Sequence, residues 1–323
     1  MIEEKVLNSL KKYGNTSIAF SCIQENLNYY FYEDGFIAYK KINIFSQHSQ
    51  IAVLGDPICA EENKYKILQN FITKYKHIFF VQINNSTKKI LNQLNYYIFP
   101  FGIDYYINIH SHKISWKKKS IKKSINWQKN NNIKIKEEKN CDNEFWQKFK
   151  TLKKKFLNKK KFVLKTHSFL NRPLTTKEKN VRFFYLEQNN RIISFIRCDP
   201  IYKNKSINGY SLSYIIYDPE IKKNLTYGIL NQLISLLKKE KEIIHLALGT
   251  APYTQTNLNS LYLKIFQKCL FYLGSYFYNF KNLKKFKQDL ATNYTYTYFA
   301  SRKKVPIKDL LSTYCLTTGL EPK

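Results

Sequence analysis

The stretch that most constrains the fold runs from Arg191 to Pro252, because strands, turns and one amphipathic helix follow each other there in a fixed order. Arg191–Arg197 and Tyr210–Tyr217 are rich in β-branched and aromatic residues, which predicts two strands with a break at Asn208–Gly209. Asp218–Pro219 is expected to end the second strand, because proline lacks the N–H group that a strand ladder needs. The stretch is therefore typical of a sheet built from short strands.

An amphipathic helix is predicted over residues 225–241, with Lys238, Lys239 and Lys241 in its last turn, where cations suit the helix dipole. Its apolar residues recur at helical spacing: Ile229, Leu230, Leu233, Ile234 and Leu237. Ile243–Leu248 predicts a further strand, which Gly249 is expected to stop. Strands followed by a helix that returns to a parallel strand form an α/β unit with a right-handed crossover. This unit is typical of an acyltransferase-like core and also of other small α/β domains.

The amino-terminal part repeats this order of strands, a helix and a strand. Helices are predicted near 2–13, 61–76 and 87–95, and strands at Ser17–Ser21, Tyr29–Tyr32, Phe36–Tyr39, Gln50–Leu54, Ile78–Gln82 and Tyr105–Ile109. A further helix is predicted near 143–158, early in the second half. The repeat predicts an α/β (α+β) chain with two related domains, 1–114 and 132–323, joined by a basic helix over 115–131. Trp116, Ile121 and Ile125 can form one apolar edge of that helix, whose lysines either face solvent or contact phosphates.

The chain is strongly basic, with a formal net charge of +31 from 54 Lys and Arg residues against 23 Asp and Glu residues. Five of these cations are arginines, which leaves 54 − 5 = 49 lysines, and asparagine and isoleucine are abundant as well. That composition is typical of a coding bias toward A and T, so the charge indicates either a selected basic surface or drift. A selected surface would bind polyanions such as RNA phosphates or an anionic membrane face.

The cysteine and hydropathy patterns indicate a reducing, aqueous compartment. The six cysteines have no CxxC spacing, so we expect free thiols. No apolar run reaches the length of about 18 residues that a transmembrane helix needs, and the acidic start Met1–Lys5 lacks the apolar core of a secretory signal. We therefore expect a cytoplasmic protein, or one bound peripherally at the inner face of the membrane.

Several stretches carry a family resemblance through their order and spacing across nearly the whole chain. They are Gly35–Tyr39 with Leu54–Pro57, Trp116–Ile125, Phe169–Pro173 with Asp199–Tyr202, Ser213–Pro219 with Leu248–Pro252, and Tyr278–Lys287. With these stretches the chain resembles the carboxy-terminal catalytic domain of phosphatidylglycerol lysyltransferases and its soluble stand-alone relatives of unknown function. The resemblance implies two GNAT-like acyltransferase domains in tandem. It also implies transfer of an aminoacyl group from a charged tRNA to a hydroxyl or amine acceptor, such as phosphatidylglycerol or another lipid headgroup.

The chain departs from that family in two ways. The membrane-spanning half of the lipid-modifying members is missing. Those members have an acidic and a basic residue in the strand before the Asp-Pro pair, and the corresponding places here hold Ser213 and Ile216. These departures bear on the acceptor more than on the fold.

The helix start at Lys222–Gly228 bears on the donor. GNAT acetyltransferases hold the pyrophosphate of coenzyme A with a glycine-rich turn at a helix start. Lys222–Gly228 has one glycine and no GxG spacing, which argues against an acyl-CoA donor. An aminoacyl ester on tRNA is already activated, so we expect charged tRNA as the co-substrate and no cofactor.

The candidate site residues lie beside the predicted strand ends of the second domain. Asp199 and Asp218 are the catalytic candidates, as a general base or as carboxylates that hold an amine. Both precede a proline, so they can instead serve only as turn formers. Gly249 either allows close approach of a ligand to the backbone or simply stops a strand. The predicted substrate-binding residues are Ser213, Tyr217, Gly249 and Tyr253, together with Lys281, Lys284 and Lys287, which follow a strand-like run at Phe271–Phe280 and otherwise form a solvated face.

Three functions remain open from the sequence. They are a soluble aminoacyl-tRNA-dependent transferase, an acyl-CoA-dependent GNAT-type acyltransferase, and a non-catalytic module that binds RNA or membrane. His110 and His112 share a strand face without a third ligand, so no metal site is predicted. The amino acid, the acceptor and the oligomeric state are not specified by any of these patterns.

Overall fold

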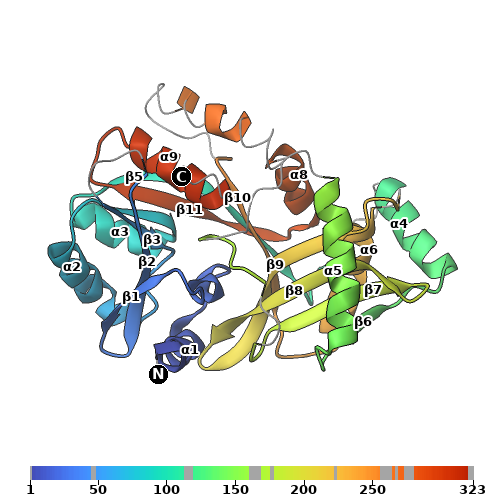
Figure 1. Ribbon diagram of the computed structural model, residues 1–323. Coiled ribbons are helices and arrows are strands. Elements are labelled where there is room, and N and C mark those ends of the chain that lie inside the picture. The colour runs from blue at the N-terminus through green and yellow to red at the C-terminus, as the bar shows by residue number, and fades with distance from the viewer. Residues whose placement is uncertain are drawn as a thin grey trace.

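The computed structural model describes residues 2–44, 49–112, 119–159, 169–174, 178–221, 224–254, 264–265, 268–272 and 280–318. Within these residues, eleven strands form one sheet, and helices cover both of its faces (Figure 1). The strands are β1 (Asn28–Tyr32), β2 (Gly35–Ile42), β3 (Gln50–Leu54), β4 (Ile78–Ile83), β5 (Tyr97–Asn108), β6 (Ile135–Glu138), β7 (Arg182–Gln188), β8 (Arg191–Lys203), β9 (Ser206–Tyr217), β10 (His245–Pro252) and β11 (Asn293–Ser301). The helices are α1 (Ile2–Tyr13), α2 (Lys64–Lys74), α3 (Asn85–Gln93), α4 (Lys119–Asn130), α5 (Asn143–Asn158), α6 (Leu225–Leu237), α8 (Phe280–Leu290) and α9 (Ile307–Thr318), with 3₁₀ turns η1 (Ala19–Cys22) and η2 (Glu61–Asn63).

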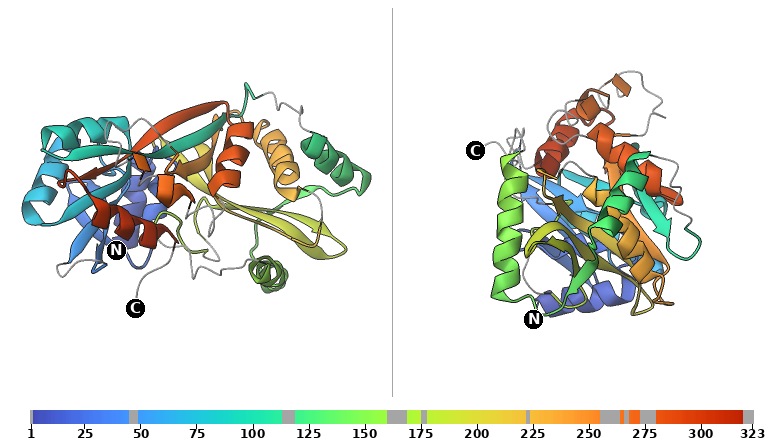
Figure 2. Two further views of the ribbon diagram at one scale, coloured as in Figure 1. Left: turned by 90° about the horizontal axis from the view of Figure 1, so that it is seen from above. Right: turned by 90° about the vertical axis from the view of Figure 1, so that its right-hand side faces the viewer.

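The two halves of the sheet share one strand order and exchange their last strands. The order across the sheet is β1-β2-β3-β4-β11-β5-β10-β9-β8-β7-β6. In each half a helix joins two parallel strands, α2 between β3 and β4 and α6 between β9 and β10. The strand that follows pairs with the parallel strand of the other half, β11 with β4 and β5 with β10. β5 and β11 also pair with each other, and they lie side by side as the long teal and red strands in the left view of Figure 2.

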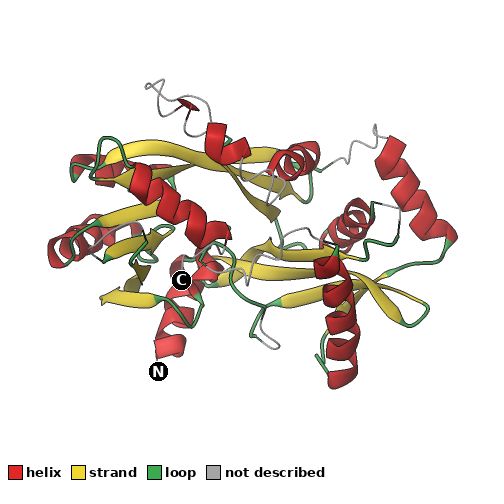
Figure 3. Cartoon of the chain, turned by 45° about the horizontal axis from the view of Figure 1, so that its top comes forward, coloured by secondary structure: helices red, strands yellow, loops and turns green. Residues whose placement is uncertain are grey.

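The amino-terminal half has helices on both faces because its strand residues alternate in direction. Ile37 and Tyr39 of β2 pack in one cluster with α2 and α3, through residues such as Phe71. Phe36 and Ala38, which point the other way, pack in a second cluster with α1 and α9. Figure 3 shows the resulting arrangement, with red helices on both sides of the yellow strands.

The carboxy-terminal half is also layered, with α5 on one face of its strands and α6 on the other (Figure 1). Phe149 of α5 contacts Phe195 of β8 with ring centroids 4.6 Å apart. On the opposite face, Leu230 and Leu233 of α6 are fully buried against the sheet, and α4 covers the outside of α6. This half therefore resembles the first half in layering as well as in strand order.

Most of the predicted elements are confirmed. The helices predicted over 2–13 and 143–158 are α1 and α5, and the predicted end of a strand at Asp218–Pro219 is the end of β9. The parallel return is confirmed by the pairing of His245–Ala247 with Gly209–Ser211. These elements have strong local periodicity, which is why the sequence sufficed for them.

Two predictions between β7 and β9 are wrong. The hairpin turns at Asn204 and Lys205, which both have positive φ, and not at Asn208–Gly209. β8 also continues through Asp199 and Pro200, so Asp199 does not lie at a strand end. Pro200 is tolerated because the pairing of β8 with β7 ends at Cys198, so its missing N–H group faces no ladder.

Further predictions are wrong at element ends. Ser17–Ser21 is not a strand, and η1 occupies part of it. β10 continues through Gly249, α6 ends at Leu237 before its predicted lysine turn, and residues 268–272 are helical rather than extended. Trp116 and residues 273–279 lie outside the described residues.

The predicted division at 1–114 and 132–323 remains a prediction. β11 comes from the predicted second domain and lies between β4 and β5 of the first, while β5 pairs with β10 of the second. The sheet is therefore continuous across the predicted boundary.

Candidate functional site

The candidate site begins where β9 and β10 separate. The two strands pair through Gly209–Ser211 and His245–Ala247 and no further, although β9 continues to Tyr217. Beyond this point β10 pairs with β5 alone, and a bulge in β10 lies between Ala247 and Gly249. The separation opens a notch between two strands that begin as neighbours.

Gly249 has a backbone φ of +76°, in the left-handed region that favours glycine. A Cβ atom at this position would lie 3.5 Å from the Nζ atom of Lys287. The bulge therefore brings bare backbone up to a lysine side chain of α8.

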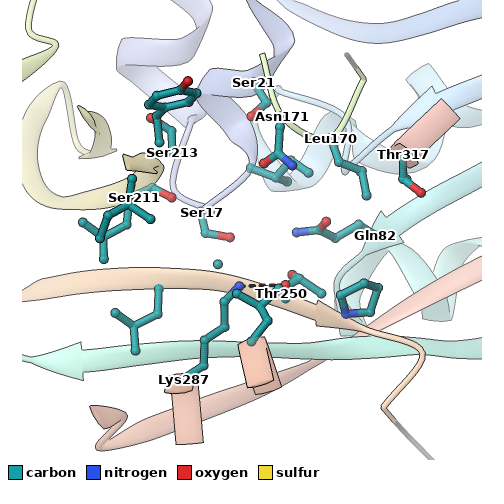
Figure 4. A pocket seen from close by; sticks show the side chains of 18 of the residues that line it. Ser17, Ser21, Gln82, Leu170, Asn171, Ser211, Ser213, Thr250, Lys287 and Thr317 are labelled. Carbon is teal, nitrogen blue, oxygen red and sulfur yellow. Dashed lines mark hydrogen bonds between the residues drawn. The ribbon is translucent and has the colours of Figure 1, made fainter. Parts of the chain in front are cut away.

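A cavity of about 210 Å³ fills the notch and extends toward the amino-terminal half. Figure 4 shows Ser211 on one side of Ser17 and Gln82 on the other, with Lys287 and Thr250 along the floor. Its polar lining comes from the segment before η1 (Ser17), η1 (Ser21), β4 (Gln82), the 169–174 segment (Asn171), β9 (Ser211, Ser213), β10 (Thr250), α8 (Lys287) and α9 (Thr317). Both halves of the chain therefore build one cavity.

Lys287 is the only lysine or arginine among the described residues that line this cavity. It is 6% exposed, and its Nζ atom donates a hydrogen bond of 2.8 Å to the carbonyl oxygen of Thr250. Burial lowers the pKa of Lys287 to about 8, against an opposing effect of the Asp104 charge. At pH 7 roughly a tenth of such side chains are neutral amines, several hundredfold more than for an exposed lysine.

Asp104 lies on the exchanged strand β5 and is buried close to Lys287. Its Oδ2 atom accepts hydrogen bonds from the hydroxyls of Ser17 at 2.5 Å and Tyr106 at 2.6 Å. Burial raises the pKa of the Asp104 carboxyl, although these hydrogen bonds and the charge of Lys287 oppose the rise. Ser17, Asp104 and Lys287 therefore form a chain of polar groups from the cavity wall to its floor.

The 169–174 segment forms a second wall of the cavity, held at both ends. The side-chain amide of Gln24 donates to the carbonyl oxygen of Phe169 at 2.7 Å and accepts from its N–H at 3.0 Å. Arg172 forms two hydrogen bonds to the carboxylate of Asp199, at 3.0 and 2.8 Å, and Arg197 donates to the carbonyl oxygens of Arg172 and Pro173.

The Asp199 carboxylate is paired with both Arg172 and Arg197. Burial alone would raise the pKa of Asp199, but the charges of Arg197 and Arg172 outweigh it and hold the pKa below its usual range. The network holds Asn171 at the cavity, while Asp199 itself does not line it.

The structure brings together three of the predicted site residues. Ser213, Gly249 and Lys287 all line the cavity, and the Ser213 hydroxyl accepts a hydrogen bond of 2.8 Å from Nε of Arg197. Tyr253 is buried beside the cavity, where its ring packs against Phe101.

The other predicted residues lie away from the cavity lining. Asp218 caps its own turn, with Oδ1 accepting from the N–H of Glu220 at 2.9 Å and Oδ2 lying 3.4 Å from Nζ of Lys155. Tyr217 is 39% exposed, and on α8 Lys281 is exposed and Lys284 is half-buried. The catalytic roles predicted for Asp199 and Asp218 remain predictions.

Sequence reasoning missed Ser17, Gln82, Asp104 and Ser211. A carboxylate inside the apolar run of β5 was the available signal for Asp104, because acidic residues are almost never buried without partners. Ser17 and Ser211 carried no signal, because a serine within an apolar run is common.

The described residues contain no group of three or more His, Cys, Asp or Glu side chains placed to hold a metal ion. His112 is buried, and burial lowers its pKa. No helix in the described ranges is long and apolar enough to span a bilayer.

Comparison with known proteins places these features in a family. The family model for the C-terminal part of phosphatidylglycerol lysyltransferase matches residues 7–301. L-PGS from Bacillus licheniformis is similar in structure, with 18% identity and a TM-score of 0.82 over 99% of this chain and 97% of that chain. The C-terminal domain of a protein named as a putative lysylphosphatidylglycerol synthetase from Agrobacterium fabrum matches with 14% identity and a TM-score of 0.78 over the whole of both chains.

FemX is more distant, with 9% identity and a TM-score of 0.58 over 97% of this chain and 98% of that chain. No curated protein matches the sequence. The structural likeness confirms the predicted fold class, a mixed α/β (α+β) chain.

Proposed function

Because the chain belongs to the family of phosphatidylglycerol lysyltransferase C-terminal domains, we propose that it is an aminoacyl-tRNA-dependent transferase. It moves an aminoacyl group from a charged tRNA to a hydroxyl or amine acceptor, with phosphatidylglycerol or another lipid headgroup as the first acceptor class to examine. Charged tRNA is a co-substrate in this scheme, and no cofactor is needed because the ester is already activated. The site of action is the cytoplasm or the inner face of the membrane.

The observation that supports this proposal most strongly is the position of Lys287 in the composite cavity. A group that takes a proton from an attacking hydroxyl works best when its pKa is near the operating pH. The pKa of Lys287, lowered by burial to about 8, meets that condition. Lys287 is also held in place by its hydrogen bond to Thr250, so its amine points into the cavity.

The reaction then proceeds as an acyl transfer at the ester carbonyl. The neutral Lys287 amine takes the proton as the acceptor oxygen or nitrogen attacks the carbonyl carbon. The bond from that carbon to the ribose oxygen of the tRNA breaks, and Lys287 returns the proton to the leaving ribose oxygen. Asp104 stabilises the protonated state of Lys287 between these two steps.

The tRNA body needs a basic surface, and α8 offers one next to the cavity. Lys281 and Lys285 are exposed on the helix that carries Lys287, so phosphates bound there would lie close to the floor of the cavity. Each neutralised phosphate releases counterions, so binding should weaken steeply as salt rises.

The test is transfer of labelled amino acids from a mixture of charged tRNAs to vesicles that contain phosphatidylglycerol, or to a total lipid extract. Wild type is compared with Lys287→Met, which keeps the side-chain length and removes the amine, and with the matched control Lys281→Met on the exposed face of the same helix. We expect Lys287→Met to lower transfer by about a hundredfold or more, the scale of a lost general base, and Lys281→Met to lower it by less than about threefold.

Three outcomes would contradict the proposal. Full activity in a folded Lys287→Met variant would remove Lys287 from the chemistry. Saturable binding of acetyl-CoA with acetyl transfer, and no transfer from any charged tRNA, would replace the proposed donor by acyl-CoA. Binding of tRNA or vesicles without any transfer would indicate a non-catalytic module.

A further inference from the structure

We propose that the cavity takes an aminoacyl group whose side chain is uncharged and discriminates against lysyl and arginyl groups. The inference rests on the proposed function, since it names the class of donor that the same cavity would accept.

The charged side chains in and next to the described lining of the cavity are positive. Lys287 lies at its floor, and Arg197 stands directly behind the wall, 2.8 Å from the Ser213 hydroxyl that lines it. Arg197 is fully buried. A cationic donor side chain would therefore approach two cations in a site with little water to screen them.

The carboxylates near the cavity, Asp104 and Asp199, already have hydrogen-bond or ion-pair partners. Asp104 accepts from Ser17 and Tyr106 and balances Lys287, and Asp199 is held by Arg172 and Arg197. The described residues that line the cavity include no Asp or Glu. The sequence of the remaining segments contains one acidic residue, Glu321. A buried ammonium group needs a carboxylate partner, and the described lining offers the Lys287 amine in its place.

The cavity lining also contains neutral polar side chains that can bond to an uncharged ligand. Ser21, Gln82 and Ser211 are buried side chains that line the cavity and make no side-chain hydrogen bond to the described residues. Because these side chains line the cavity and keep hydrogen-bonding capacity there, a ligand with neutral polar groups can bond to them directly. A hydroxyl or an amide on the donor side chain supplies that match without a charge.

The test uses stable analogues in which adenosine carries an amino acid through a 3′-amide in place of the ester. Calorimetry compares the alanyl, seryl and lysyl analogues on the full chain. We expect the alanyl and seryl analogues to bind at least tenfold more tightly than the lysyl analogue. Ser211→Asp places a carboxylate in the lining and should reduce that preference by at least tenfold. Ser211→Asn has nearly the same shape without the charge, and it should keep the wild-type preference.

The wild-type comparison decides the matter even if Ser211→Asp does not fold, and thermal melting identifies that case. A lysyl analogue that binds wild type as tightly as the alanyl analogue would overturn the inference. Transfer from lysyl-tRNA in preference to alanyl-tRNA and seryl-tRNA would overturn it while leaving the proposed function in place. Binding of no analogue, with no transfer from any charged tRNA, would overturn both.

Discussion

The strand pairs β3–β4 of the first half and β9–β10 of the second half begin in the same way and end differently. We call the end of the β3–β4 pair the closed notch and the end of the β9–β10 pair the open notch. Each is a parallel pair in which the first strand leads to an Asp-Pro pair, Asp56–Pro57 or Asp218–Pro219. β3 pairs with β4 up to its last residue, and the N–H of Gly55 continues the ladder to Val81 at 2.9 Å. β9 stops pairing with β10 at Ser211 and continues alone to Tyr217, so the cavity opens there.

A strand that leads to an Asp-Pro pair is therefore not sufficient to form a site. β4 and β10 each contain a bulge, and each has one residue of positive φ there, Gln82 (61°) in β4 and Gly249 (76°) in β10. The residue of positive φ has a long side chain in the closed notch, Gln82, and no side chain in the open notch, Gly249. The first half then contributes Gln82 and Ser17 to a cavity that belongs to the second half's notch.

The largest expected effect comes from giving the open notch the residue of the closed one. Gly249→Gln should lower transfer by about a hundredfold or more, because the new side chain starts 3.5 Å from the Lys287 amine and displaces the substrate. The fold should survive, since a glutamine already occupies the corresponding bulge at Gln82, at a strain cost of about 1–2 kcal/mol. Transfer rates and thermal melting of the purified variant measure the two effects.

The reciprocal variant Gln82→Gly is the matched control for that exchange. It removes a lining side chain without filling the cavity, so transfer should change by less than about tenfold. Equal losses in the two variants would mean that the notches do not differ in function and that the comparison fails.

Beside the open notch, the buried ion pair between Asp199 and Arg172 holds the 169–174 segment in place. Asp199→Asn removes one partner of a buried ion pair and should lower the free energy of unfolding by about 3–5 kcal/mol. Asp218→Asn keeps the turn and removes only a partly exposed ion pair with Lys155, so stability should fall by less than about 1 kcal/mol. Denaturant unfolding of both variants gives these values.

The same pair of variants tests the predicted catalytic carboxylates. We expect transfer by Asp218→Asn within about threefold of wild type, well below the loss expected for a general base. A hundredfold loss in a well-folded Asp218→Asn variant would assign the base to Asp218 in place of Lys287.

The sequence predicted the helices and strands better than it predicted which strands pair with each other. The periodicity of α5 and the Asp-Pro stop after β9 are local signals, and both are confirmed. The position of β11 between β4 and β5 is set by pairing between distant segments, which local patterns do not encode. The predicted strand stop at Gly249 is wrong because a glycine in a bulge and a glycine at a strand end look alike in sequence.

The site residues divide in the same way. Ser213, Gly249 and Lys287 were predicted as substrate-binding residues beside the strand ends of the second domain, and the structure places them in one cavity. The sequence grouped Lys287 with Lys281 and Lys284 as one basic face, whereas burial of the helix separates it from them. Asp104 comes close to Lys287 only through the exchange of β5 between the halves, which no local pattern indicates.

A smaller effect is expected from the surface lysines of the two halves. Replacing Lys281 and Lys284 by glutamine should reduce the slope of log affinity for tRNA against log salt by about 0.7–0.9 for each phosphate that is no longer neutralised. Replacing Lys66 and Lys89, on α2 and α3 of the first half, should leave the slope unchanged. Filter binding across a salt series measures both, and equal slopes in all variants would indicate that the lysine excess is compositional.

The most direct test of the central claim is the pH dependence of single-turnover transfer from charged tRNA, corrected for spontaneous ester hydrolysis. Burial lowers the pKa of Lys287 to about 8, so the neutral amine accumulates as the pH rises through that value. The rate should therefore increase from pH 6.5, reach half its maximum near pH 8 and level off above it. Lys287→Met should show a low rate without this step. A wild-type rate that is flat from pH 6.5 to 9, or a Lys287→Met variant with the same profile as wild type, would contradict the account.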